Sequence, residues 1–194
     1  CEESGQTGDS ECLWVIDPLD GTSNYLHGIP HFAVSIAYQQ KGRTEHAVVY
    51  DPLRDEMFTA SRGSGAALNQ KRIRVSARKE LDGAILATAF PFRERKLLPK
   101  YSRVFQSVLR QVEDFRRAGT ASLDLAWTAA GRLDGYFEVG VKPWDIAAGA
   151  LIVREAGGVV EVMGWRRLFV YAGQDFLGSA IGEVVVVAMP LVAI

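Results

Sequence analysis

The sequence predicts an α/β fold in which layers of sheet and helix alternate. Short strand patterns dominate the first half of the chain, an amphipathic helix pattern follows, and two alanine-rich apolar segments come after it, each with a strand pattern beyond it. Strands followed by alternating helices and strands are typical of layered α/β and α+β proteins. Because no repeat and no linker composition divides the chain, we expect a single domain over residues 1–194.

The first strand pattern is the apolar run at residues 13–16, which we expect to be a buried strand that ends at an Asp-Pro dipeptide. Strand patterns follow at residues 32–38, 47–50 and 56–60. Lys-Gly and Asp-Pro pairs separate them, which predicts an antiparallel meander. A further strand is expected at residues 84–88.

Three helices are expected in the second half of the chain. Apolar residues recur at helical spacing from Tyr101 to Val112, which predicts an amphipathic helix. Residues 122–130 and 145–155 are apolar on nearly every side, so we expect them to pack between other layers, and we expect the tryptophan and phenylalanine side chains in the core. Gly119-Thr120 marks the start of the helix expected at residues 122–130, and Gly157-Gly158 marks the end of the helix expected at residues 145–155. Strands are expected at residues 158–162 and 183–188.

Composition excludes several classes of function. With 194 residues, 48% of them hydrophobic, the chain can bury a real core, so it is not disordered. Its 22 basic and 23 acidic residues give a net charge of −1, and its basic clusters are short, so no direct nucleic-acid partner is expected. The longest apolar run, residues 184–194, is shorter than the roughly 20 residues that span a bilayer, so no membrane association is expected. The two cysteines form no disulfide or zinc pattern, which favours a cytoplasmic location.

The segment that follows the first strand carries the chemistry. Asp17 and Asp20 are three residues apart, and Pro18 and Gly21 can turn both carboxylates toward one point. Converging oxygen ligands suit Mg²⁺. If a helix begins here, the backbone N–H groups of Gly21 and Thr22 would offer a site for phosphate oxygens. Together these features indicate metal-assisted phosphoryl chemistry.

Each acidic residue also has a structural interpretation. Asp-Pro and Asp-Gly pairs are common turn formers, so Asp17 and Asp20 could serve only that purpose. Asp145 stands at the start of an apolar helix, where it could complete the acidic cluster or act as an ordinary N-cap. Glu2-Glu3 taken alone is more often a solvated pair. The three histidines share no ligand spacing, and no serine has a recognisable histidine and acid partner, so neither an imidazole metal site nor a serine hydrolase is expected.

The motifs resemble those of the inositol monophosphatase family of magnesium-dependent, lithium-sensitive phosphatases. The resemblance is closest to the bacterial extragenic-suppressor (SuhB-type) members and runs from Glu2 to about residue 162. It is specific because several separate motifs occur in the family's order and spacing. These are Glu2-Glu-Ser, Asp17-Pro-Leu-Asp-Gly-Thr, Pro30-His-Phe-Ala-Val-Ser, Val49-Tyr-Asp-Pro, Gly119-Thr-Ala, Trp144-Asp and Arg154-Glu-Ala-Gly-Gly.

The resemblance implies a set of metal ligands. Glu2, Asp17 and the backbone carbonyl of Leu19 would hold one Mg²⁺. Asp17, Asp20 and Asp145 would hold a second, with Asp17 bridging the two ions. Two ions placed in this way activate an attacking water and stabilise the leaving oxygen in an in-line displacement.

The resemblance also implies contacts to the substrate. The Thr22 hydroxyl, near Glu2, would orient the attacking water. The N–H of Ala121 and the carboxylate of Glu138 would contact inositol hydroxyls, although Glu138 could instead lie on the polar face of a strand at residues 136–139. The implied catalytic set is Glu2, Asp17 and Thr22, and the implied phosphate- and substrate-binding set is Asp20, Gly21, Thr22, Ala121, Glu138 and Asp145.

The activity expected from the resemblance is Mg²⁺-dependent hydrolysis of a small polyol or sugar monophosphate, above all myo-inositol 1-phosphate, by a homodimer. Related substrates remain open, because nucleotide-derived phosphates, fructose bisphosphate and histidinol phosphate are handled by the same metal motifs. A different class of function is a protein-binding role in transcription, which SuhB-type proteins carry out through RNA polymerase and its elongation factors. A degraded, non-functional gene product is a third possibility.

Family members begin with further residues that form two helices and a hairpin beside the site. We therefore expect this chain to be a fragment without the N-terminal helices, which binds Mg²⁺ more weakly than a complete member and has reduced or no activity. The segment from residue 163 onward matches the family only loosely.

Overall fold

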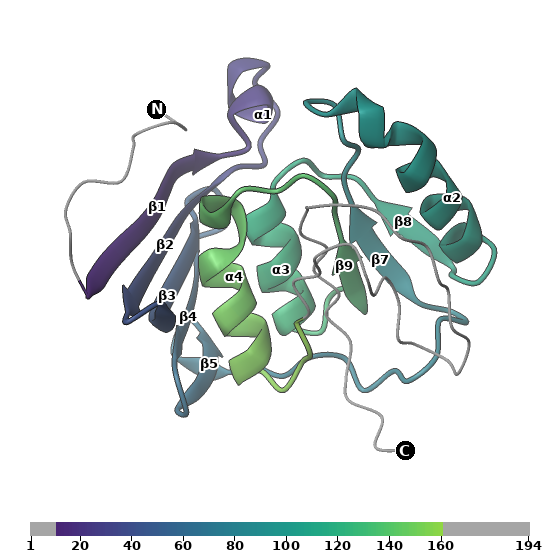
Figure 1. Cartoon of the computed structure of the whole chain (residues 1–194). Coiled ribbons are helices and arrows are strands. Elements are labelled where there is room, and N and C mark those ends of the chain that lie inside the picture. Colours follow the sequence, from purple (N-terminus) through teal and green to yellow (C-terminus); the bar gives the residue numbers. More distant parts are fainter. Residues whose placement is uncertain (1–10, 161–194) are drawn as a thin grey trace.

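The computed structural model describes residues 11–160, which fold into alternating layers of sheet and helix (Figure 1). A six-stranded sheet forms one side of the molecule. A pair of helices, α3 and α4, covers its inner face, a three-stranded sheet follows, and α2 packs on the outside. The predicted α/β layering is confirmed.

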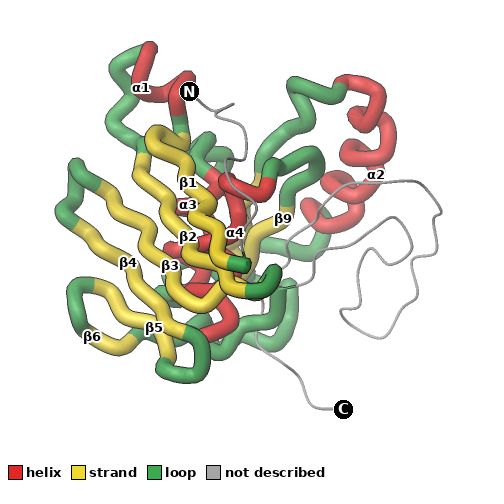
Figure 2. Tube along the Cα trace, turned by 60° about the vertical axis from the view of Figure 1, so that its left-hand side comes forward, coloured by secondary structure: helices red, strands yellow, loops and turns green. Residues whose placement is uncertain are grey.

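The large sheet is an antiparallel meander with its strands in sequence order (Figure 2), as predicted. Its β2–β3 hairpin closes through Lys41 and Gly42, both with positive φ (49° and 74°). This backbone favours the tight turns whose twist matches that of paired strands. The strands are β1 (Cys12–Asp20), β2 (Ala33–Gln40), β3 (Arg43–Asp51), β4 (Glu56–Ser61), β5 (Gly65–Leu68) and β6 (Lys71–Arg72).

The small sheet is parallel, with β7 (Ile85–Thr88) between β8 (Asp114–Arg116) and β9 (Gly135–Phe137). The strand expected at residues 84–88 is therefore confirmed. The strands β5, β6 and β8 are not predicted from the sequence, because two to four residues are too few to show a period.

The helices are α1 (Thr22–Leu26), α2 (Leu98–Leu109), α3 (Ala121–Ala129) and α4 (Pro143–Glu155), and a 3₁₀ turn, η1 (Arg95–Leu97), leads into α2. The α3 and α4 helices are buried on most sides because they lie between the two sheets, which explains why they are apolar all round. Among the described residues, none of the helices combines the length and apolarity that a membrane span requires.

Three expectations are corrected. The first strand is longer than predicted and is half-exposed, with Trp14 63% and Ile16 47% exposed, because only its alternate side chains face α4. Phe92, 62% exposed, also lies outside the core. Of the strand expected at residues 158–162, the described part contains only an isolated bridge at Gly158. The strand expected at residues 183–188 lies outside the described residues.

Gly149 sets the distance between α3 and α4. A Cβ at this position would lie 2.6 Å from both Cβ and Cδ1 of Leu125. Alanine favours helix by about 1 kcal/mol over glycine, but this contact requires the helices to separate, and overpacking of this kind destabilises by about 1–3 kcal/mol. We expect Gly149→Ala to lower the free energy of unfolding in urea, whereas Gln106→Ala on the exposed side of α2 changes it by less than about 0.5 kcal/mol. A Gly149→Ala protein as stable as the parent would contradict this packing argument.

Candidate active site

The end of β1, the starts of α3 and α4, and the segments after β7 and β9 surround one cleft of about 620 Å³. Most of the site residues predicted from the sequence face this cleft, although they come from segments more than 120 residues apart. The cleft is lined by Asp17, Asp20, Gly21, Thr22, Ala121, Glu138 and Asp145, among others.

The two aspartates of the motif lie where β1 loses its regular pairing with β2. The register shifts between Asp17 and Asp20, and both side chains are buried. One oxygen of Asp17 accepts the N–H of Leu19 at 3.0 Å, and one oxygen of Asp20 accepts the N–H of Ser122 at 2.7 Å. Because Ser122 is in the first turn of α3, Asp20 supplies a carboxylate to a helix N-terminus, where negative charge is favourable.

Gly21 allows α3 to approach β1 this closely. Its φ is 91°, and a Cβ would lie 2.6 Å from the Thr120 hydroxyl oxygen and 3.0 Å from the carbonyl oxygen of His31. The same carbonyl accepts hydrogen bonds from Thr120 (3.2 Å) and from the side-chain amide of Asn24 (2.8 Å), and that amide also donates to the carbonyl of Ala118 (2.9 Å). A network of buried polar contacts thus joins α1 to the segment before α3.

Thr22 is the first residue of α1, and its hydroxyl donates to the carbonyl oxygen of Leu19 at 2.9 Å. A carbonyl oxygen has two lone pairs, so this hydrogen bond is compatible with cation binding at the same oxygen. A helix does begin here, as the phosphate site considered from the sequence requires, although it has only five residues. Glu2 lies outside the described residues, so its proximity to Thr22 stays a prediction.

Asp145 has two roles in the structure. It is the third residue of α4, and its carboxylate accepts the N–H of Lys142 at 2.7 Å in a capping box. The same half-buried side chain lines the cleft. The N-cap of α4 is Lys142, so the interpretation of Asp145 as an ordinary N-cap is wrong, although its side chain does contribute to the capping of the helix from the third position.

Glu138 follows directly after β9 and lines the cleft, so it is not on the polar face of a strand. The hydroxyl of buried Tyr136 donates to it at 2.5 Å. Burial raises the pKa of Glu138 to about 7, and the charge of Asp145 adds to the increase, while the hydrogen bond from Tyr136 and the charge of Arg117 oppose it.

The carboxylates form a strongly acidic environment. Burial raises the pKa of Asp20 to about 7 against the effect of its hydrogen bond to Ser122, and the charges of Asp17 and Asp145 raise it further. Within residues 11–160, no three acidic, histidine or cysteine side chains are close enough to form a complete metal site. The donor set nevertheless fits Mg²⁺, because it consists of hard oxygens whose mutual repulsion a divalent cation would relieve.

Three residues around the cleft were not singled out from the sequence. Tyr136 could have been found, because residues two apart in an extended segment face the same side. Asp124 is a buried carboxyl in α3 whose pKa is raised well above its usual value, first by burial and then by Glu138 and Asp20. Asp124 could have been identified from the sequence because it is an acidic residue inside an otherwise apolar helix. Arg117, which belongs to one of the short basic clusters of the sequence, places its guanidinium 5.4 Å from the ring centre of Phe92 at the cleft.

The model of the inositol monophosphatase family matches residues 1–185 of the chain. The chain belongs to this family. It is 56% identical over 180 residues to the Nus factor SuhB of Pseudomonas aeruginosa, covering 92% of this chain and 66% of that protein. The family resemblance inferred from the sequence is confirmed.

Solved structures agree with this assignment. The extragenic suppressor protein SuhB of Bartonella henselae is 50% identical, with a TM-score of 0.76, over 79% of this chain and 59% of that one. The inositol monophosphatase of Anabaena is 39% identical, with a TM-score of 0.82, over 97% of this chain and 72% of that one. The chain spans about two thirds of the length of the curated relatives it matches.

Glu138 makes the stability of the metal-free protein depend on pH. Its pKa rises from about 4.5 to about 7 on folding, so the folded state holds this proton more tightly than the unfolded state. The contribution of this proton to the free energy of unfolding is complete below about pH 4.5 and is lost as pH rises through 7. We expect the urea midpoint of EDTA-treated protein to fall between about pH 5 and pH 8, and to fall less in Glu138→Gln. The exposed Glu80→Gln is the control, and an equal fall in both variants would refute this role for Glu138.

Proposed function

We propose that the protein is a Mg²⁺-dependent phosphatase of a small polyol or sugar monophosphate, with myo-inositol 1-phosphate as the substrate we favour. The observation that carries the proposal is that Asp17, Asp20 and Asp145 line one cleft, which Gly21 and Glu138 also line. Membership in the inositol monophosphatase family supports it.

In this proposal residues at the end of β1 and at the start of α4 would hold the metal. Asp17, Asp20 and Asp145 supply carboxylate oxygens, Leu19 supplies its carbonyl oxygen, and Glu2 completes the set. Asp17 and Asp20 are each oriented by a backbone N–H, so these carboxylates need little reorganisation to bind a cation. When bound, Mg²⁺ supplies activation of a water and stabilisation of the leaving oxygen.

The other cleft residues bind and orient the substrate. Gly21 and Thr22 offer backbone N–H groups to phosphate oxygens, and the Thr22 hydroxyl orients the attacking water together with Glu2. Ala121 is the first residue of α3, where an N–H has no partner within the helix, so it can donate to a substrate hydroxyl. With a pKa of about 7, Glu138 can accept or donate a hydrogen bond to a polyol near neutral pH.

The proposal includes a homodimer and inhibition by lithium, which family membership favours. Other monophosphates of the superfamily, namely nucleotide-derived phosphates, fructose bisphosphate and histidinol phosphate, are the alternative substrates. They would use the same carboxylates, so comparison of their rates with that of myo-inositol 1-phosphate assigns the substrate.

Release of inorganic phosphate from myo-inositol 1-phosphate as a function of Mg²⁺ tests the activity. We expect release that requires Mg²⁺ and that falls by more than about 100-fold in Asp17→Asn, because this substitution would remove an anionic metal ligand. Asp82→Asn, an exposed aspartate outside the cleft, is the matched control and should retain the parental rate. Equal rates in the parent and in Asp17→Asn would rule out the proposed metal site. If the parent releases no phosphate but still binds Mg²⁺ in calorimetry, the proposed phosphatase activity is wrong for this chain and only the proposed metal binding stands.

A second candidate is a protein-binding role in transcription. The observation in its favour is the 56% identity to a protein named a Nus factor. This role needs the folded surface but not the metal ligands. We expect Asp17→Asn to lose hydrolysis while it still binds RNA polymerase or its elongation factors in a pull-down with purified components. Loss of binding and hydrolysis together, in a variant that unfolds like the parent, would contradict a separate binding role.

A further inference from the structure

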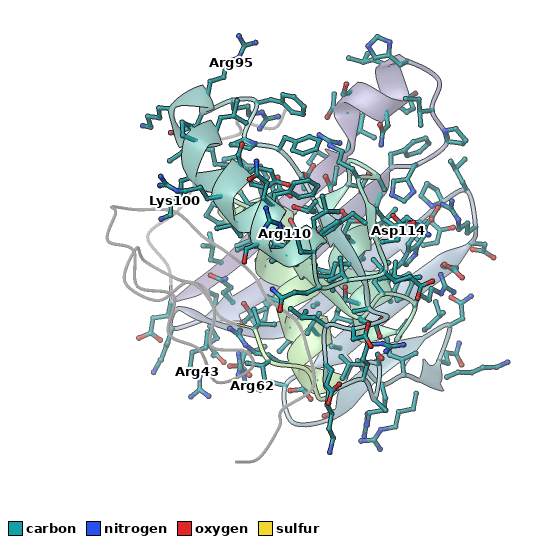
Figure 3. The ribbon with its side chains drawn as sticks, turned by 90° about the vertical axis from the view of Figure 1, so that its right-hand side faces the viewer. Arg43, Arg62, Arg95, Lys100, Arg110 and Asp114 are labelled. Carbon is teal, nitrogen blue, oxygen red and sulfur yellow. The ribbon has the colours of Figure 1, made fainter. Side chains whose placement is uncertain are left out.

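The outer face of α2 carries a row of cations. Between Arg95 and Val112 the sequence contains five basic residues and no acidic one. At about 100° per residue, Lys100, Arg103 and Arg110 fall within a sector of about 80° on the helix. We call these three residues the basic stripe. Figure 3 shows Arg95, Lys100 and Arg110 along this one segment.

A shallow groove of about 390 Å³ lies along the stripe. Arg103 and Arg110 are two turns apart, which separates their Cα atoms by about 10 Å along the helix. Between and beyond them lie Gln106, Ser107 and Gln111, and the Gln111 amide donates to the carbonyl of Ser107 at 3.0 Å. The groove therefore combines guanidinium groups with neutral hydrogen-bonding side chains.

The packing of α2 does not involve two members of the stripe, Arg103 and Arg110. The opposite face of the helix packs Tyr101 and Val108, both buried, into the core between α2 and the small sheet. Arg103 and Arg110 point away from this core and are exposed. Of the acidic residues that flank this segment, Glu94 pairs with Lys96 at 2.9 Å and Asp114 pairs with Arg116, while the exposed Glu113 follows Val112 directly.

We propose that the basic stripe binds the phosphate backbone of a nucleic acid. Arginine, lysine, glutamine and serine are the side chains that contact phosphates and sugars in protein–nucleic acid complexes. The groove contains no aromatic residue on which a base could stack, so binding is independent of base sequence. An interface with a protein usually has buried apolar or aromatic anchors at its centre, and the exposed Leu98 and Leu109 lie outside the sector of the stripe.

This surface is separate from the phosphatase cleft, because none of the groove residues lines the cleft. The net charge of −1 gives no indication of the basic stripe, because acidic residues elsewhere in the chain balance its positive charge. Single basic residues three and seven positions apart also do not form a cluster in the sequence. Only the helix brings them together on one face.

Fluorescence anisotropy with a labelled single-stranded RNA tests the proposal on the whole chain at several salt concentrations. We expect binding that weakens as salt increases. In Arg103→Gln/Arg110→Gln, we expect affinity about tenfold lower and a salt dependence (log K against log[salt]) shallower by about 1.4, because two phosphate contacts are lost. The matched control is Arg43→Gln/Lys71→Gln, which removes two exposed cations from the large sheet and should bind like the parent.

Single-stranded DNA and duplex RNA in the same assay identify which nucleic acid is preferred, and binding of any of them through the stripe supports the proposal. Equal affinities in the two double variants would overturn it, as would no binding at low salt. Competition by polyglutamate as effective as that by unlabelled RNA would also overturn it, because the surface would then be one for acidic polypeptides. Phosphate release by Arg103→Gln/Arg110→Gln should equal that of the parent, which separates this result from the outcome for the phosphatase.

Discussion

The structure of the cleft depends on the close approach of α3 to the end of β1. Gly21 permits this approach, since any side chain there would collide with Thr120 and with the backbone at His31. The hydrogen bond from the N–H of Ser122 to Asp20 then fixes the helix terminus against the strand. This contact places Ala121 beside the aspartates, although the two segments are about a hundred residues apart in the chain.

The same arrangement places carboxyl groups close enough together to repel one another. Asp20 and Glu138 both have pKa values raised to about 7, mainly by burial, and neighbouring carboxylates raise them further. Buried Asp124 adds another acidic group from α3. A fold under selection for stability alone would not gather acids in this way, because burying a charge is unfavourable without a compensating partner. The repulsion is consistent with a site whose cation is part of its function.

Charge is therefore distributed unevenly in a nearly neutral chain. Carboxylates line the cleft at the end of β1 and the starts of α3 and α4, whereas cations occupy the outer face of α2. The alternating layers explain the separation. Helices between two sheets are buried and carry few charges away from their ends, while α2 has one face that points away from the core and can be polar without affecting it.

The sequence by itself determined the layered fold, the antiparallel meander, the amphipathic α2 and the family, because period, turn residues and motif spacing are local properties. It also identified Asp17, Asp20 and Asp145, whose grouping in one cleft the structure describes. Only the tertiary structure decided that β1 is half-exposed, that Tyr136 holds Glu138, and that α2 presents a basic face. Each of these depends on which surfaces meet, and contacts between distant segments leave no fixed spacing in a single sequence.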